Sequence, residues 1–153
     1  EMVDLYQVDG IIAEPAGAIS PASVGPADAE VPVPIEAGST VVCVISGGNN
    51  DLSRYAEVLE RALVWEGLQH YFIVNFPQEP GALRRFLDNV LGPDDDVSMF
   101  EYVKRSDREI GPAFVGITLG RAEDLTGLLE RMDESPLEIE RVSQDSPLFR
   151  MFV

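Results

Sequence analysis

Residues 70 to 142 alternate between strand-like and helix-like segments, and this order constrains the fold more than any other feature of the sequence. The segment YFIVNF at 71–76 is rich in aromatic and β-branched residues, which favours a strand. The next segment has apolar residues at the spacing of one helix face, namely Leu83, Phe86, Leu87, Val90 and Leu91. We therefore expect a strand followed by a helix with one buried face.

A hairpin and a second helix are predicted next. GPDDD at 92–96 breaks the helical pattern and is predicted to be a solvated turn, and VSMFEYV at 97–103 and AFVGITL at 113–119 are typical of paired strands. Apolar residues from Leu125 to Met132 again have helical spacing, and Pro136 ends that helix. LEIERV at 137–142 is predicted to be the last strand of the pattern, and LFRMFV at 148–153 is a candidate for one more.

The resulting order from residue 70 is β-α-β-β-α-β. This order is typical of the ferredoxin-like α+β fold, in which two helices cover one face of an antiparallel sheet. Many unrelated activities use this fold, so the fold alone does not identify a function.

The charge of the chain excludes two classes of function. The sequence has 27 acidic and 11 basic residues, for a net charge of −16, and such a surface repels nucleic-acid phosphates and anionic lipids. No apolar run approaches the roughly 20 residues that span a bilayer. We expect a soluble, cytoplasmic protein that binds neither nucleic acid nor membrane.

No metal site is predicted. The acids of 94–96 lack the alternation that a calcium loop requires. His70 has no acid at a recognisable spacing, so we expect it to be structural or exposed.

The first third of the chain differs in composition from the rest. Residues 1–53 contain no Lys or Arg but hold eight acids. Two apolar runs, at 10–13 and 40–46, are continuous rather than alternating, which favours strands of a parallel sheet covered on both faces. Between them the Pro-rich stretch 21–38 is predicted to be a loop. Two strands do not make a domain, so we expect residues 1–50 to be the end of a larger α/β domain.

A connecting helix is predicted after this segment, over DLSRYAEVLERALVWEGL, with Asp51 as its cap. The sequence also begins at Glu1 rather than Met, which favours a piece of a longer protein.

Several motifs carry a resemblance to a known family. AEPAGA at 13–18, SGGNN at 46–50, YFIVNFPQEPGAL at 71–83, FEYVKR at 100–105 and SPLFRMFV at 146–153 resemble biosynthetic threonine dehydratases, also called threonine ammonia-lyases. The resemblance implies three parts. Residues 1–50 would be a remnant of the pyridoxal-phosphate-dependent catalytic domain of fold type II, 51–69 a connecting helix, and 70–153 an ACT-like regulatory domain. The Pro-rich 21–38 departs from the helix that the family usually has there.

The resemblance assigns five residues to the cofactor site of the parent enzyme. Ser46 would hydrogen-bond the pyridine nitrogen, Glu14 would line the same pocket, and Gly47, Gly48 and Asn49 belong to the same Gly-rich stretch. The only lysine in the sequence is Lys104, in the predicted hairpin, and no phosphate cradle is visible. We therefore expect no catalytic residue in this chain and no pyridoxal phosphate bound to it alone.

The turn at EPGAL has two readings. Pro at the first helical position is an ordinary helix start, and from the residues alone this reading is preferred. The resemblance implies a second interpretation, since in ACT domains generally the effector lies beside this turn, commonly at an interface between two such domains, and the unpaired N–H groups of a helix start suit a carboxylate. The candidate effector residues are Gln78, Glu79, Gly81, Ala82, Leu83, Phe100, Glu101 and Tyr102.

The resemblance implies the regulatory portion of an enzyme that converts L-threonine to 2-oxobutanoate and ammonia in isoleucine biosynthesis. Isoleucine would inhibit this enzyme and valine would oppose the inhibition. The expected partners are isoleucine or valine, a second copy of the chain, and the rest of the catalytic domain. The alternative is an ACT-like dimerisation module that binds no ligand.

Overall fold

The computed structural model describes residues 1–24, 34–49, 51–102 and 109–152 of the chain. The chain divides into two compact units, Glu1–Leu59 and Glu60–Val153, and each is described by itself.

The first unit contains short helices and a small core. Its elements are α1 (Met2–Gln7), the 3-10 helix η1 (Pro15–Ala18), α2 (Ile19–Ala22) and the first half of α3 (Leu52–Trp65). Leu5, Ala13 and Ala18 form its buried cluster. This core is small, and many of the apolar side chains of this unit are exposed.

The two strands expected in this unit do not form. The segment 10–14 has no regular secondary structure, and neither does 40–49. Val42 is 81% exposed and Val44 68% exposed. The apolar run at 40–46, which we expected to be covered on both sides, is therefore open to solvent. A strand needs neighbouring strands for its backbone hydrogen bonds, and the described residues of this unit supply none. The remnant of an α/β domain expected here is therefore not seen as a sheet.

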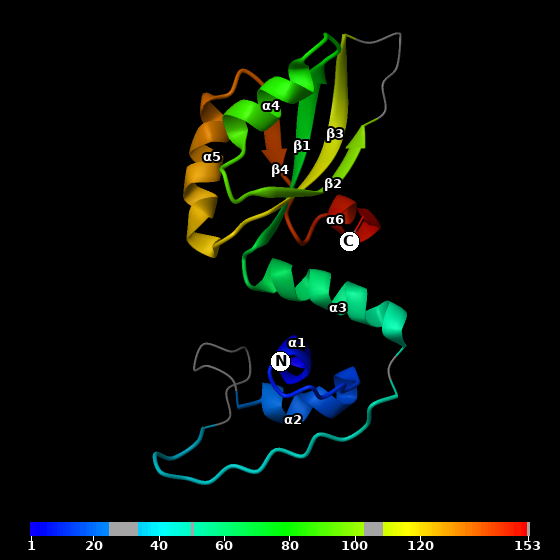
Figure 1. Cartoon of the computed structure of the whole chain (residues 1–153), viewed down its shortest axis with the longest axis vertical. Coiled ribbons are helices and arrows are strands. Elements are labelled where there is room, and N and C mark those ends of the chain that lie inside the picture. The colour runs from blue at the N-terminus through cyan, green and yellow to red at the C-terminus, as the bar shows by residue number, and fades with distance from the viewer. Residues whose placement is uncertain (25–33, 50, 103–108, 153) are drawn as a thin grey trace. The chain divides into compact units, whose positions relative to one another are not determined.

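The second unit has the strand and helix order expected from the sequence. Its elements are β1 (Gln69–Pro77), α4 (Ala82–Val90), β2 (Asp96–Tyr102), β3 (Ile110–Thr118), the 3-10 helix η2 (Ala122–Asp124), α5 (Leu125–Glu134), β4 (Glu138–Arg141) and α6 (Pro147–Phe152). The four strands pair in the order β2-β3-β1-β4, and every pair is antiparallel. Figure 1 shows α4 and α5 together on one side of this sheet. The expected βαββαβ arrangement is confirmed.

Alternation along the strands places the main core between the sheet and these two helices. Phe72, Val74 and Phe76 of β1 point to this side, and so do Val115 and Ile117 of β3. All are almost fully buried, together with Phe86 and Val90 from α4 and Leu128 and Met132 from α5. The apolar spacing of both helices is thereby explained.

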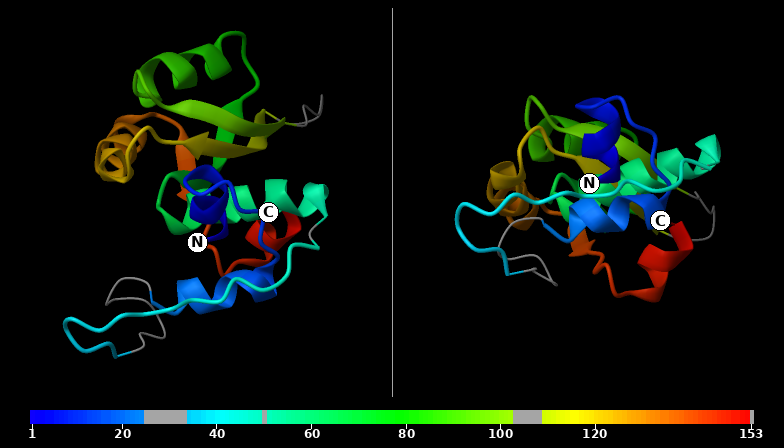
Figure 2. Two further views of the ribbon diagram at one scale, coloured as in Figure 1. Left: turned by 60° about the horizontal axis from the view of Figure 1, so that its bottom comes forward. Right: turned by 90° about the horizontal axis from the view of Figure 1, so that it is seen from below.

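The opposite face of the sheet is partly covered by the part of α3 from Glu60 onward and by α6. Tyr71 and Phe114 stack there with ring centroids 5.5 Å apart, and Phe149 of α6 meets Tyr71 edge to face at 5.5 Å. Figure 2 shows α6, in red, on the side of the sheet away from α4. The Tyr71 hydroxyl also donates a hydrogen bond to Glu60 of α3 at 2.5 Å.

The additional strand considered at 148–153 is wrong, because residues 148–152 belong to the helix α6; residue 153 lies outside the described residues. Pro147 takes the first helical position, which suits its fixed φ and missing N–H. The Ser146 hydroxyl accepts a hydrogen bond from the Phe149 N–H at 3.1 Å, as a helix cap does.

The turn after α4 is not simply solvated, as the sequence predicted. Asp94 and Asp96 are exposed, but the Asp95 side chain is only 4% exposed and pairs with Arg131 at 3.1 Å. Asp95 also accepts a hydrogen bond from the Gly92 N–H at 2.6 Å. Arg131 in turn donates from Nε to the Val90 carbonyl at 2.6 Å. The acid and the arginine therefore join the end of α4, the turn and α5.

His70 is structural, as expected. Its side chain is buried, and Nε2 lies 2.8 Å from the Gly67 carbonyl. Its Nδ1 lies 3.1 Å from the Arg141 guanidinium. A guanidinium can only donate, so Nδ1 accepts and Nε2–H donates to Gly67, which describes a neutral ring. Burial lowers the pKa of His70, and the nearby Arg141 charge lowers it further.

Candidate functional site

A surface depression of about 440 Å³ lies at the turn between β1 and α4. The end of β1, the start of α4 and the end of β2 converge there because β1 and β2 are both neighbours of β3 in the sheet. The depression is lined by Gln78, Glu79, Gly81, Ala82, Leu83, Arg84, Leu87, Asp88 and Tyr102.

Gly81 gives the turn its shape. It is the N-cap of α4 and has φ of 85°, in the left-handed region that side chains other than glycine adopt at a cost. A Cβ built on it would meet nothing closer than Arg85 Nη1 at 3.6 Å. The need for glycine here is therefore conformational rather than steric.

The helix start leaves backbone donors available at the depression. The Arg85 N–H donates to the Gly81 carbonyl at 3.0 Å, which is the first intrahelical bond of α4. The N–H groups of Leu83 and Arg84 precede this bond and have no intrahelical acceptor. Such groups, with the positive end of the helix dipole, favour an anion.

Gln78 contributes a buried side-chain donor. Its backbone N–H donates to the Glu109 carbonyl at 2.9 Å, which fixes the residue at the end of the sheet. Its side-chain Nε2 is buried and has no hydrogen-bond partner among the described residues. An unpaired buried donor costs about 1–3 kcal/mol. A ligand with a hydrogen-bond acceptor would satisfy this donor.

Apolar side chains form one wall of the depression. Leu83 and Leu87 lie on consecutive turns of α4 and are 40% and 38% exposed. The sequence pattern predicted both to be buried, so the structure corrects that prediction.

The Tyr102 ring completes this wall. It packs against Phe76 and Phe100 with centroids 6.1 and 6.3 Å away. Gly111 makes room for the ring, since a Cβ there would lie 2.7 Å from Tyr102 Cε2.

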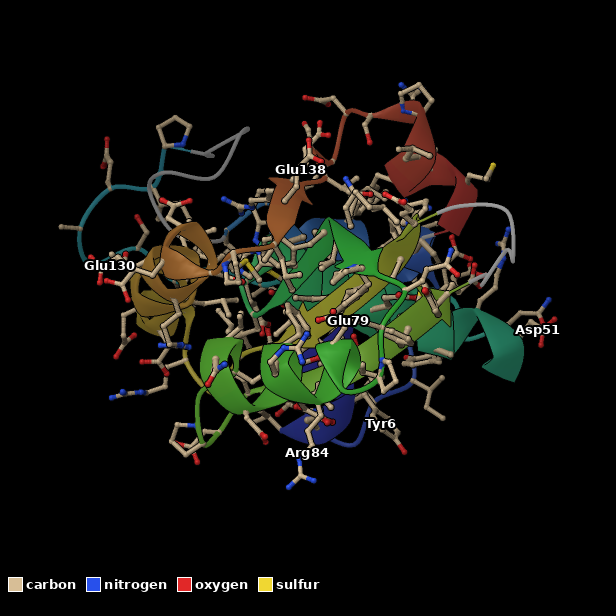
Figure 3. The ribbon with its side chains drawn as sticks, turned by 90° about the horizontal axis from the view of Figure 1, so that it is seen from above. Tyr6, Asp51, Glu79, Arg84, Glu130 and Glu138 are labelled. Carbon is tan, nitrogen blue, oxygen red and sulfur yellow. The ribbon has the colours of Figure 1, made fainter. Side chains whose placement is uncertain are left out.

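Charged groups surround the depression in two pairs. Glu79 pairs with Arg85, and both side chains are more than half exposed. Arg84 lies 3.5 Å from Asp88, one helical turn further along α4. Figure 3 shows Arg84 extending outward from the helix, away from the rest of the domain.

The structure brings together most of the predicted effector residues. Six of them line the depression: Gln78, Glu79, Gly81, Ala82, Leu83 and Tyr102. Phe100 instead packs with the core behind Tyr102. Glu101 pairs in register with Phe114 and so points to the opposite face of the sheet.

Sequence reasoning missed three lining residues, Arg84, Leu87 and Asp88. Leu87 follows Leu83 by one helical turn, which is a signal that the sequence already contained.

The residues predicted for the cofactor site also lie near one another. The Glu14 N–H donates to the Gly47 carbonyl at 3.2 Å, and Gly47 has φ of 85°. A Cβ on Gly17 would overlap the Ser46 and Gly47 carbonyls, so the AEPAGA turn lies directly against the SGG segment. Gly48 and Asn49 continue that segment and are exposed. Their cofactor role stays a prediction.

The described residues contain no cluster of three or more His, Cys, Asp or Glu that could hold a metal ion. In the same part of the chain, no helix combines the length and apolarity needed to cross a membrane.

The comparisons with known proteins all point to one family, that of the threonine dehydratases. The family model for the C-terminal regulatory domain of threonine dehydratase matches residues 60–152. The chain is 64% identical over 149 residues to the L-threonine dehydratase biosynthetic IlvA of Mycobacterium tuberculosis, covering 97% of this chain and 33% of that protein. It is 56% identical over 147 residues to the protein of that name from Corynebacterium glutamicum, covering 96% and 32%. The Bacillus subtilis protein of that name is 48% identical over 152 residues, covering 99% and 35%.

The chain spans about a third of the length of these relatives. The matched family residues coincide with the second unit, which holds the four-stranded antiparallel sheet and the depression. The resemblance seen in the sequence motifs is confirmed, and the chain belongs to the family of C-terminal regulatory domains of threonine dehydratase.

Proposed function

We propose that the depression at the β1–α4 turn binds a branched-chain amino acid, isoleucine or valine, and that the chain is the effector-sensing portion of a threonine dehydratase. One observation carries this proposal. Gln78 Nε2 is buried and unpaired among the described residues, and the depression it lines also receives the N–H groups of a helix start.

Each part of a branched-chain amino acid has a counterpart in the depression. Its carboxylate accepts from Gln78 Nε2 and from the N–H groups of Leu83 and Arg84. Its ammonium pairs with the Glu79 carboxylate, next to Gln78 in the chain. Its aliphatic side chain packs on Leu83, Leu87 and Tyr102, which supplies apolar burial. Phe100 supports the Tyr102 ring from behind, and Glu101 takes no part.

Calorimetric titration of isoleucine and valine into the 153-residue chain tests the proposal. Replacement of Gln78 by Met keeps the length of the side chain and removes the donor. A hydrogen bond to a charged group contributes about 1.5–3 kcal/mol, so Gln78→Met should weaken binding at least tenfold. Gln144→Met is the matched control, since Gln144 is exposed and does not line the depression.

The opposing result would be a folded chain that gives no binding heat with either amino acid. The domain would then be an ACT-like assembly module in which EPGAL is only a helix start.

We further propose that the domain pairs with a second copy of itself. β2 and β4 are the edges of the sheet, and edge strands present unpaired backbone groups that proteins usually cover. The exposed Leu83 and Leu87 beside the depression add apolar surface for a neighbour. Light scattering of the purified chain, with and without isoleucine, measures this association.

The first unit is proposed to complete the catalytic domain of the parent enzyme. The division into a remnant at 1–50, a connecting helix at 51–69 and an ACT-like domain at 70–153 is part of this proposal. The exposed apolar run at 41–45 would then pair with strands in the rest of the catalytic domain.

The residues of this unit fit one side of the pyridoxal phosphate site. The close approach at Gly17 holds Glu14 beside the Ser46–Gly47 segment, where the Ser46 hydroxyl would meet the ring nitrogen of the cofactor. Bound pyridoxal phosphate would supply the electron sink for conversion of L-threonine to 2-oxobutanoate and ammonia. Lys104, the only lysine of the sequence, lies outside the described residues, in the predicted regulatory hairpin. The lysine that carries the cofactor must therefore come from the rest of the enzyme.

Control of the enzyme would follow from unequal binding of the effector to two arrangements of the enzyme. An effector changes activity only by binding one arrangement of the enzyme more tightly than another, with typical couplings of about 1–3 kcal/mol. We propose that isoleucine favours the less active arrangement, that valine opposes it, and that this regulation operates in the cytoplasm on the first step of isoleucine biosynthesis.

A further inference from the structure

We propose that Arg85 competes with the effector's ammonium for Glu79 and so sets the concentration at which the depression fills. This inference rests on the proposed function and adds to it a residue that tunes affinity without touching the ligand.

The geometry places Arg85 behind the depression. Its Nη2 contacts Glu79 Oε1 directly, but Arg85 is absent from the lining of the depression. It lines a separate cavity of about 420 Å³ on the other side of the turn, together with Phe86, Asn89 and Leu137. Glu79 lines both. Its carboxylate is thus reached by Arg85 from one side and by a ligand from the other.

The remaining charges of the depression leave Glu79 as the ammonium's partner. Asp88 is two helical turns beyond Gly81 and lies by Arg84 at 3.5 Å. Gln78, which we expect to hold the carboxylate, is adjacent to Glu79 in the sequence. In an amino acid the ammonium and the carboxylate share one carbon, so they must bind to neighbouring groups. The ammonium therefore meets the acid that Arg85 already occupies.

Exposure of the ion pair determines how strongly Arg85 competes. The Arg85 and Glu79 side chains are 55% and 58% exposed, and exposed ion pairs are weak. Arg85 therefore lowers the affinity for an amino acid by a factor of roughly two to five rather than blocking the site.

The test compares isoleucine with its desamino analogue, 3-methylpentanoate, which has the same carboxylate and side chain but no ammonium. Dissociation constants for both ligands are measured by calorimetry with the wild-type 153-residue chain and with Arg85→Gln. We expect Arg85→Gln to bind isoleucine roughly two- to fivefold more tightly, and 3-methylpentanoate no more tightly than wild type does.

Two further variants complete the design. Arg121→Gln is the matched control, because Arg121 is also an exposed arginine paired with an acid, Asp124, and lies outside the depression. It should bind isoleucine as wild type does. Glu79→Gln should weaken isoleucine binding and abolish the gain from Arg85→Gln in the double variant. Thermal unfolding by circular dichroism checks that each variant is folded.

The outcomes separate this inference from the proposed function. If wild type binds isoleucine while Arg85→Gln binds it equally or more weakly, Arg85 does not compete for Glu79, and the proposed function stands. Equal tightening of both ligands also overturns the inference, because the gain would not depend on the ammonium. If wild type binds no branched-chain amino acid, the inference and the proposed function both fall.

Discussion

Removal of the Asp95 carboxylate is expected to destabilise the regulatory domain substantially, although it lies in a short acidic turn. The side chain is 4% exposed and pairs with Arg131. In Asp95→Ala the Gly92 N–H loses its acceptor at 2.6 Å, and an unsatisfied donor costs about 1–3 kcal/mol.

The lost ion pair adds less to the cost. The Arg131 side chain is 34% exposed, so water can rehydrate its guanidinium, and we discount this term to roughly 0.5–1 kcal/mol. Arg131 also keeps its bond to the Val90 carbonyl. The sum is about 1.5–4 kcal/mol for Asp95→Ala. Asp95→Asn retains an acceptor for Gly92 and should cost about 1 kcal/mol.

Urea denaturation followed by far-ultraviolet circular dichroism measures these differences, with the slope of the transition checked for equality between variants. Asp94→Ala is the matched control, because Asp94 is the preceding residue and is exposed. Its free energy of unfolding should change by less than about 0.5 kcal/mol. An Asp95→Ala variant as stable as Asp94→Ala would refute the proposed role of this network.

Three further changes test single features of the domain. His70 is the only histidine, and burial lowers its pKa in the folded protein, so the unfolded chain takes up the proton first as the pH falls. The free energy of unfolding should therefore decrease as the pH drops through about 6.5 towards the lower folded pKa, by at most about 1.4 kcal/mol per pH unit. In His70→Gln the urea midpoint should change less across this pH range. Gly81→Ala should cost about 1–2 kcal/mol in thermal unfolding because of the positive φ, and Gly81→Asn should cost less, so equal melting temperatures for wild type and Gly81→Ala would contradict the assigned conformation. Gly111→Ala should displace the Tyr102 ring, since its Cβ would lie 2.7 Å from Tyr102 Cε2, and lower the free energy of unfolding by about 1–3 kcal/mol; an unchanged Tyr102 ring spectrum by NMR would argue against this contact.

The βαββαβ order could be predicted because each of its elements has a local cause. The strands β1 and β3 are rich in aromatic and β-branched residues, and the helices α4 and α5 have apolar spacing that matches their buried faces. The two runs at 10–13 and 40–46 carry an equally strong apolar signal but form no strand. Apolarity predicts that a segment will be buried, but a strand also requires hydrogen-bonding neighbours, and the described residues of this unit supply none.

The sequence predicted the part of the candidate site that comes from one contiguous turn, but not the part that depends on strand register. The turn from Gln78 to Leu83 is contiguous, so its residues necessarily meet. Tyr102 and Glu101 are neighbours in sequence but point to opposite faces of β2, and only the register with β3 determines which of them reaches the depression. The irregularity between Val97 and Met99 shifts that register. Counting alternate residues from the start of the strand therefore gives the wrong face.

The apolar face of α4 is wider than the core requires, and this surplus creates the candidate site. Ala82, Phe86 and Val90 are spaced by four residues and are buried against the sheet. Leu83 and Leu87 are each one residue further along, which rotates them by about 100° around the helix axis, and they remain 40% and 38% exposed. The sequence stripe thus contains two neighbouring rows, one that packs on the sheet and one that borders the depression. Exposed leucines beside an unpaired donor and a helix start have little value to an isolated domain, but they suit a small ligand that is apolar at one end and zwitterionic at the other.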